Sequence, residues 1–204
     1  GTESMPESLL LKLRMAFPKT RLLQTFGTSE TGIAQTSSRS SDSLEIKIDG
    51  PNTQYKIVEG ELWLKSKTQV MGYLNASMES FTEDGWFKTG DLVEELEGDY
   101  LRIKGRSKEV INVGGEKVLP AEVESIVLEV EGVADCTAYG EKNVITGQIV
   151  AVQVVLEAGI DKKEAKRFIR KYCKQKLDSY KVPAKFEFVE QTNFSERFKK
   201  KRGF

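Results

Sequence analysis

Residues 147–156 are apolar on both of the faces that a β-strand presents. Successive side chains of a strand point to opposite faces, so alternate positions of this segment belong together. One face is formed by Val150, Val152, Val154 and Leu156, and the other by Ile149, Ala151 and Val155. A strand of this kind belongs in the middle of a covered sheet. We therefore expect residues 147–156 to be a central strand.

The neighbouring segments predict a compact unit of helices and strands around it. Residues 121–130 and 161–177 have the spacing of amphipathic helices, and Asp161 is a suitable N-cap for the second. Residues 133–139 and 185–189 are expected to be strands. The predicted buried stripe of the second helix consists of Ala165, Phe168, Ile169, Tyr172, Cys173 and Leu177.

The first half of the chain predicts one helix and then short strands. Residues 6–17 have helical spacing, residues 21–26 are expected to form a strand, and residues 33–42, rich in serine and threonine, a loop. The patterns that follow predict strands at residues 44–48, 55–58, 61–65 and 100–104. Such short strands, joined by turns, predict a small antiparallel barrel or sheet.

The stretch of residues 105–117 separates the two halves. Its first four residues, Gly105 to Lys108, favour neither a helix nor a strand, because glycine frees the backbone and serine competes for its hydrogen bonds. Residues 109–113 predict a strand, and Gly114 and Gly115 a tight turn. A surface hairpin between two subdomains is the simplest interpretation.

Charge and residue usage limit the kinds of function. Residues 1–104 carry 12 basic and 16 acidic side chains (net −4), whereas residues 105–204 carry 19 and 15 (net +4). This difference suits a matched interface or an anionic ligand between the halves. The absence of histidine excludes histidine-based catalytic triads and histidine metal ligands. Cys136 and Cys173 lie in apolar patterns and are expected to be reduced core residues of a cytoplasmic protein.

Two segments carry candidate binding groups. Residues 27–32 begin and end with glycine and carry hydroxyl side chains between the two glycines. This composition fits a loop that binds phosphate, but also an ordinary serine and threonine turn. Residues 85–92 contain a predicted Thr-Gly-Asp turn that would hold Asp91 in a fixed place. Asp91 is then either a plain turn residue or an acceptor for the vicinal hydroxyls of a ligand.

Taken in order, these segments resemble motifs of the adenylate-forming superfamily, which contains acyl- and aryl-CoA synthetases, adenylation domains of nonribosomal peptide synthetases, and luciferases. The resemblance covers nearly the whole chain. The matching segments are Phe26-Gly27-Thr28-Ser29-Glu30, Gly60-Glu61-Leu62-Trp63-Leu64 with Met71-Gly72-Tyr73-Leu74-Asn75, Asp84-Gly85-Trp86-Phe87-Lys88-Thr89-Gly90-Asp91, Gly105-Arg106-Ser107-Lys108 through Gly115, and Glu122-Val123-Glu124.

The resemblance implies an α/β (α+β) fold class in two parts. Residues 1–104 would be the C-terminal part of a large AMP-binding domain, with a small antiparallel β-barrel or sheet. Residues 105–204 would be a compact α+β C-terminal lid domain, with a hinge at residues 105–108.

It also implies roles for the matching positions. Ser29 would contact the α-phosphate of ATP, Glu30 would hold Mg²⁺, and Asp91 would bind the ribose hydroxyls of the nucleotide. Arg106 would lie beside the ribose and phosphate. The cofactor-binding positions implied are Phe26, Gly27, Thr28, Ser29, Asp91, Ile103, Arg106 and Gly115.

Three of the implied roles belong to the second half. Lys108 would be the hinge residue, and Gly115 would line the channel of the thiol acceptor, where glycine allows a close approach of backbone. Lys199 would be the catalytic lysine on the acyl-phosphate oxygens, with Lys200 and Lys201 as competitors because Phe198 stands where the family has glycine.

This sequence also departs from the family pattern. Phe26 and Ser29 replace the usual tyrosine and threonine. Nothing in the chain resembles the loop that holds the β- and γ-phosphates of ATP. We therefore expect the chain to be the C-terminal fragment of a longer enzyme and to be inactive alone.

The expected function of the full-length protein is that of an acyl-CoA synthetase, an AMP-forming acid–thiol ligase. It would convert a carboxylic acid and ATP to an acyl-AMP and then to a CoA thioester, with no nucleic acid partner and no membrane span. One alternative is an adenylation enzyme that loads the phosphopantetheine thiol of a carrier protein. A non-catalytic binding module, with nucleic acid bound by the basic tail, is a second alternative.

Overall fold

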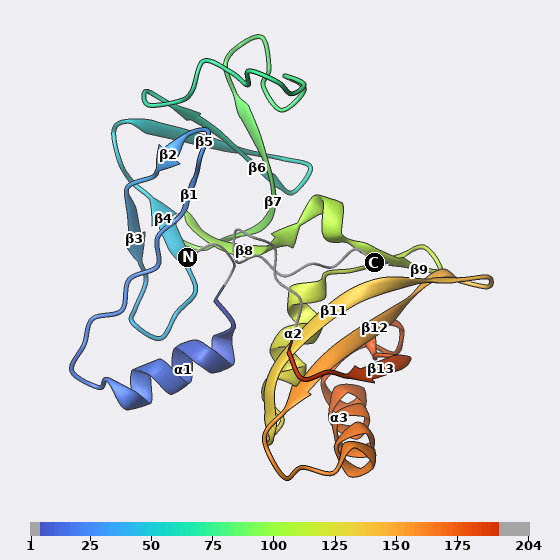
Figure 1. The fold of residues 1–204 in the computed structure, drawn as a ribbon. Helices are drawn as coiled ribbons and strands as arrows, with labels where there is room; N and C mark the ends of the chain where they lie inside the picture. The colour runs from blue at the N-terminus through green and yellow to red at the C-terminus, as the bar shows by residue number, and fades with distance from the viewer. Residues whose placement is uncertain (1–4, 192–204) are drawn as a thin grey trace. The chain divides into compact units, whose positions relative to one another are not determined.

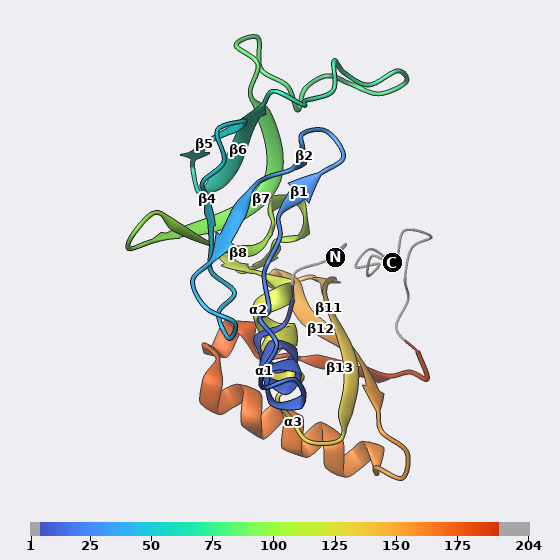
Figure 2. The ribbon, with the colours of Figure 1, turned by 90° about the vertical axis from the view of Figure 1, so that its left-hand side faces the viewer.

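The computed structural model describes residues 5–191, which divide into two compact units (Figures 1 and 2). The first unit comprises Leu9–Ser107; the second begins at Lys108 and also includes residues 5–8. Each unit builds its own sheet and its own hydrophobic core. Among residues 5–191, no helix is long and apolar enough to cross a membrane.

An antiparallel sheet of six strands, in the order β3–β4–β8–β7–β6–β5, dominates the first unit. The strands are β3 (Thr36–Ser38), β4 (Ile46–Ile48), β5 (Thr53–Val58), β6 (Glu61–Ser66), β7 (Phe87–Leu96) and β8 (Tyr100–Arg106). The helix α1 (Glu7–Ala16) and the short hairpin of β1 (Gly27–Thr28) and β2 (Gly32–Ile33) precede β3. The predicted antiparallel sheet is confirmed, and its core residues are Ala34, Ile46, Ile48, Leu62, Leu64, Val93 and Leu101.

Two predictions near the start of this unit are wrong. Residues 21–26 form no strand, because side-chain hydroxyls bind their backbone in place of a ladder. The Gln24 N–H donates to Ser38 Oγ (2.7 Å), and the Gln24 carbonyl accepts from Thr36 Oγ1 (3.0 Å). Conversely, the predicted loop at residues 33–42 contains β3, which pairs with β4.

The predicted Thr-Gly-Asp turn is also wrong, since residues 89–91 lie inside β7. Glu61 of β6 pairs with Leu92, and Trp63 pairs with Lys88. Three residues of β7 therefore lie opposite the single residue Leu62, which makes this segment a bulge. The glycine at position 90, with φ +74°, is a local turn signal that the sheet incorporates into a strand.

The second unit is built around β12 (Gly147–Leu156), as its two apolar faces predict. It pairs with β11 (Val133–Asn143) along one edge, and with β9 (Ile111–Val113) and the parallel strand β13 (Lys185–Phe188) along the other. A further strand, β10 (Glu116–Val118), pairs with β9. On β12, Val152 and Ala151, which face opposite sides, are both fully buried.

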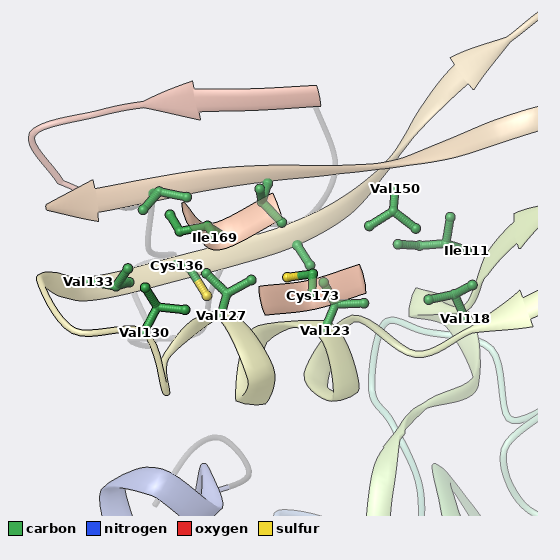
Figure 3. Packing of buried hydrophobic residues seen from close by; sticks show 13 residues of the cluster. Ile111, Val118, Val123, Val127, Val130, Val133, Cys136, Val150, Ile169 and Cys173 are labelled. Carbon is green, nitrogen blue, oxygen red and sulfur yellow. The ribbon is translucent and has the colours of Figure 1, made fainter. Parts of the chain in front are cut away.

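Helices α2 (Pro120–Val127) and α3 (Lys162–Lys176) complete the core of this unit. Val123 and Val127 of α2 meet Ile169 and Cys173 of α3 and the valines of the strands (Figure 3). Asp161 caps α3 as predicted, accepting the N–H groups of residues 163 and 164. Cys136 and Cys173 are fully buried and are not joined by a disulfide.

Two details of the predicted helices are wrong. Helix α2, predicted to extend to residue 130, ends at Val127. The chain then turns through Gly132 (φ +82°) into β11. The side chain of Phe168 is 60% exposed, because Ile169 and Cys173, one turn apart, already fill the face of α3 that meets the sheet.

Candidate functional site

The candidate phosphate loop is the tight hairpin of β1 and β2. Thr28 pairs with Gly32, and the hydroxyls of Thr28 and Thr31 lie 2.9 Å apart. The Thr31 N–H donates to Thr28 Oγ1 (3.1 Å). At Gly27 a Cβ atom would lie 2.7 Å from Ile33 Cα, so this position requires glycine. The hairpin presents an exposed Ser29 beside Glu30.

Glu30 is held by the segment of residues 70–73. The Tyr73 hydroxyl donates to Glu30 Oε1 (2.7 Å), and the Val70 N–H donates to the Glu30 carbonyl (2.8 Å). Burial and the Glu30 carboxylate raise the pKa of Tyr73 to about 12, so the phenol stays protonated and remains a donor at neutral pH. The Tyr73 ring packs edge-on against Phe81, at 5.5 Å between ring centroids.

Asp91 and Arg106 form an ion pair between adjacent strands. The two residues are direct partners in the ladder of β7 and β8, and Arg106 Nε lies 2.9 Å from Asp91 Oδ1. Asp91 is 6% exposed. Arg106 Nη1 also donates to the Thr89 carbonyl (2.7 Å). A charge-assisted contact of this kind fixes a carboxylate in orientation, and a carboxylate can accept several further hydrogen bonds.

Two other predicted nucleotide positions belong to the core of this unit. Phe26 and Ile103 are partly buried and pack against its apolar cluster. The Phe26 carbonyl accepts from the Ala34 N–H (2.9 Å), which extends the β1–β2 hairpin. Ile103 pairs with Val93, two positions beyond Asp91 on β7.

Gly115 lies at the tip of the β9–β10 hairpin in the second unit. Gly114 and Gly115 have φ of +61° and +96°, the left-handed values that a two-residue hairpin turn requires. The Gly115 N–H donates to Asn112 Oδ1 (3.0 Å), and the Gly114 N–H donates to the carbonyl of Thr146 (2.8 Å). The tip is exposed, and a Cβ on Gly115 would have no heavy atom within 4 Å.

Lys108 is an exposed residue in the 3₁₀ turn η1 (Ser107–Glu109), which follows β8 directly. The boundary between the two units falls between Ser107 and Lys108. Lys199, the predicted catalytic lysine, lies outside the described residues.

The predicted positions from Phe26 to Glu30, and Asp91, Ile103 and Arg106, thus belong to the first unit, whereas Lys108 and Gly115 belong to the second. Of these positions, the structure brings Asp91 and Arg106 into direct contact. Sequence reasoning missed Tyr73 as the partner of Glu30. It belongs to the Gly-Tyr segment, which could have drawn attention to it. Within residues 5–191, no group of three or more histidine, cysteine, aspartate or glutamate side chains could hold a metal ion.

Known proteins resemble this chain in both sequence and structure. Residues 122–199 match the AMP-binding enzyme C-terminal domain. The 2-succinylbenzoate–CoA ligase of Bacillus licheniformis is 36% identical over 150 residues, which cover 72% of this chain and 30% of that protein. Acyl-CoA synthetase 7 of Caenorhabditis elegans is 30% identical over 206 residues, covering 94% of this chain and 38% of the relative.

Among solved structures, the o-succinylbenzoate–CoA synthetase of Bacillus subtilis, in complex with an acyl-adenylate intermediate, has a TM-score of 0.81 and 26% identity. The alignment covers 98% of this chain and 43% of that protein. The chain therefore spans less than half the length of these relatives. From the family match, the ligase relatives and the shared fold together, the chain belongs to the adenylate-forming superfamily and corresponds to the C-terminal portion of its acyl-CoA synthetases.

Proposed function

We propose that the full-length protein is an AMP-forming acid–thiol ligase. It converts a carboxylic acid and ATP to an acyl-AMP and pyrophosphate, and then forms a CoA thioester with release of AMP. The observation that carries the proposal is the buried Asp91 carboxylate, oriented by Arg106 within the motif where the family binds its nucleotide. The relatives that this chain resembles include CoA ligases of several carboxylic acids.

The first unit binds the nucleotide in this proposal. Asp91 accepts hydrogen bonds from the ribose hydroxyls, Arg106 lies beside the ribose and phosphate, and Ile103 completes the nucleotide contact. The backbone and hydroxyls from Phe26 to Ser29 face the α-phosphate. Backbone N–H groups and hydroxyls are suitable donors there because the attack on phosphorus concentrates negative charge on the phosphate oxygens.

Glu30 would hold Mg²⁺. Magnesium is commonly bound by one or two carboxylates together with substrate phosphates and water, so a single oriented carboxylate beside a phosphate loop fits this ion. The metal supplies charge neutralisation on the phosphates. The residues of this chain supply the ligand oxygen and its orientation, through the hydrogen bond from Tyr73.

The second unit would serve both half-reactions as a lid. Residues 1–104 belong to the large AMP-binding domain and residues 105–204 to the lid, with the hinge at Lys108. In one orientation Lys199 would contact the acyl-phosphate oxygens, and in the other Gly115 would line the channel of the thiol. The exposed hairpin tip at Gly115 supports this role, since a backbone without a side chain allows a close approach.

The acceptor is CoA in this proposal, and the phosphopantetheine thiol of a carrier protein is the competing acceptor. The names of the CoA ligase relatives support CoA. We place the protein in the cytoplasm, which agrees with two buried cysteines that form no disulfide with each other.

Carboxylate-dependent exchange of pyrophosphate into ATP tests the proposal. The full-length protein should catalyse exchange, and the 204 residues alone should not, because no segment of their sequence resembles the loop that holds the β- and γ-phosphates. Lys199→Ala in the full-length protein should abolish exchange while it spares thioester formation from supplied acyl-AMP. Exchange by the isolated chain would contradict our location of the phosphate site. Comparing CoA with a phosphopantetheinylated carrier protein identifies the acceptor.

A further inference from the structure

On the side that faces strand β6, the peptide segment that carries Asp91 is held by side chains rather than by a regular ladder. Residues 89–91 form the bulge of β7 opposite Leu62. A second register shift follows, because Leu92 pairs with Gly105 whereas Val93 pairs with Ile103. Bulges of this kind aim a side chain, but they also interrupt the backbone hydrogen bonds that would fix it. Other groups must therefore satisfy the backbone here.

Thr89 supplies the first of these groups. Its side chain is buried, at 4% exposure, and its hydroxyl donates to the Leu62 carbonyl across the bulge (2.6 Å). The same oxygen accepts the Asp91 N–H (3.0 Å). One hydroxyl thus ties the backbone of Asp91 to strand β6.

Glu61 supplies the second. Its Oε1 accepts the N–H of Gly90 (2.8 Å), at the residue whose φ of +74° creates the bulge. A Cβ at position 90 would meet nothing closer than 3.6 Å, so the glycine is required by its dihedral angle and not by lack of space. Glu61 therefore holds the one flexible residue next to Asp91.

Arg106 closes the arrangement from the other side, since it contacts both the Thr89 carbonyl and the Asp91 carboxylate. We infer that Glu61 and Thr89 are positioning residues that hold the Asp91 carboxylate where it binds the vicinal hydroxyls of a ribose. The inference rests on the nucleotide-binding role proposed above. Neither residue contacts the nucleotide in this account; both act through the backbone at residues 90 and 91.

The test compares AMP with 2′,3′-dideoxy-AMP, which lacks both hydroxyls, by titration calorimetry of the full-length protein. The wild type should bind AMP more tightly. Glu61→Ala and Thr89→Val each remove one hydrogen-bonding group and should weaken AMP by about tenfold, with little change for the dideoxy nucleotide. The preference for AMP should therefore collapse. Glu61→Gln and Thr89→Ser keep an acceptor oxygen and a hydroxyl, respectively, and should retain the preference.

Glu94→Gln is the matched control, because Glu94 lies on the same strand but its carboxylate forms an exposed ion pair with Lys104. It should leave both affinities unchanged. Equal weakening of both nucleotides by Glu61→Ala and Thr89→Val, or of neither, would overturn the inference. Two variants are used so that unfolding of one leaves the other to decide.

Asp91→Asn separates this inference from the proposed function. If it abolishes the preference for AMP while Glu61→Ala and Thr89→Val do not, only the positioning role fails. If Asp91→Asn leaves the preference intact, the ribose role of Asp91 fails, and the positioning role fails with it.

Discussion

The Tyr73 hydroxyl donates a 2.7 Å hydrogen bond to the Glu30 carboxylate across 43 residues of sequence. The bond joins two of the motifs by which the chain resembles its family. Packed aromatic rings connect this pair to a third motif, that of residues 84–91, because Phe81 contacts both Tyr73 and Phe87. The proposed metal-binding carboxylate thus depends on a tyrosine that a row of aromatic rings holds in place.

Tyr73→Phe should raise the Mg²⁺ concentration needed for half-maximal pyrophosphate exchange by the full-length protein. Partners that orient a metal ligand commonly contribute tenfold or more to metal affinity, so we expect roughly a tenfold increase. The rate at saturating Mg²⁺ should change far less, because Glu30 itself remains. Tyr55→Phe, on β5, is the control and should leave the Mg²⁺ dependence unchanged. A loss of rate that excess Mg²⁺ does not restore would contradict this role.

Gly115→Ala should slow thioester formation from supplied acyl-AMP by about tenfold or more, because small displacements in an acceptor channel are costly to reaction geometry. Gly147 offers a close match. It also has positive φ (+75°, against +96° at Gly115), and a Cβ on it would likewise have no heavy atom within 4 Å. Gly147→Ala should therefore lower the melting temperature by a similar amount and leave the thioester step unaffected. Equal slowing by both variants would show that backbone strain alone is responsible.

Some elements follow from local pattern and others do not. The bounds of β12 agree with the predicted residues because both faces of that strand are apolar and glycine marks its start. Residues 89–91 look like a turn to any local criterion, yet they lie in β7 because β6 and β8, distant in sequence, pair on either side. Long-range pairing outweighs the local preference of Gly90.

The candidate site shows the same division. The motifs were sufficient to select Asp91 and Arg106 as candidate binding residues. Their direct pairing, however, depends on the register of β7 against β8, and the sequence pattern does not predict the register shift between Leu92 and Val93. The Glu30–Tyr73 bond is likewise invisible in sequence, since a loop of the first unit brings the two residues together. Residues 21–26 have a pattern that predicts a strand, but the hydroxyls of Ser38 and Thr36 form hydrogen bonds with the backbone of Gln24 in place of a neighbouring strand.

The second unit should lose stability above pH 9.0. Burial raises the pKa of the Cys173 thiol from 9.0 to about 11, so the folded protein keeps a proton that the unfolded chain releases. This contribution is fully present below pH 9.0 and is lost as the pH rises towards 11. For one group the free energy of unfolding falls by up to about 1.4 kcal/mol per pH unit in that range. Tyr139, whose pKa is raised to about 12 mainly by burial, adds to the loss above pH 10.0.

Urea unfolding of the chain, followed by far-UV circular dichroism at a series of pH values, measures this effect. Cys173→Ala should be less stable at neutral pH by about 1–2 kcal/mol because of the cavity, but should show a shallower decline above pH 9.0. Trp63 and Trp86 both belong to the first unit, so their fluorescence reports on that unit separately. An unchanged decline in Cys173→Ala would assign the pH dependence to other groups.

Lys108→Pro should uncouple the two half-reactions of the full-length protein. A hinge concentrates a large change of φ and ψ in a few residues at the ends of elements, and Lys108 lies in a short turn at the boundary of the units. Proline fixes φ at about −65° and removes the backbone N–H, so the variant should adopt whichever orientation tolerates that angle.

We expect Lys108→Pro to retain adenylation and to lose the thioester step by a factor of about ten or more, which corresponds to roughly 1.4 kcal/mol of barrier. Lys108→Ala leaves φ and ψ free and should be mild in both steps. The core of each unit should stay folded, because Lys108 is exposed and outside both apolar clusters. Pyrophosphate exchange and thioester formation from synthetic acyl-AMP measure the two steps separately. If the proline variant slows both steps equally at an unchanged melting temperature, or slows neither, Lys108 is an ordinary turn residue and the rotation about it does not occur.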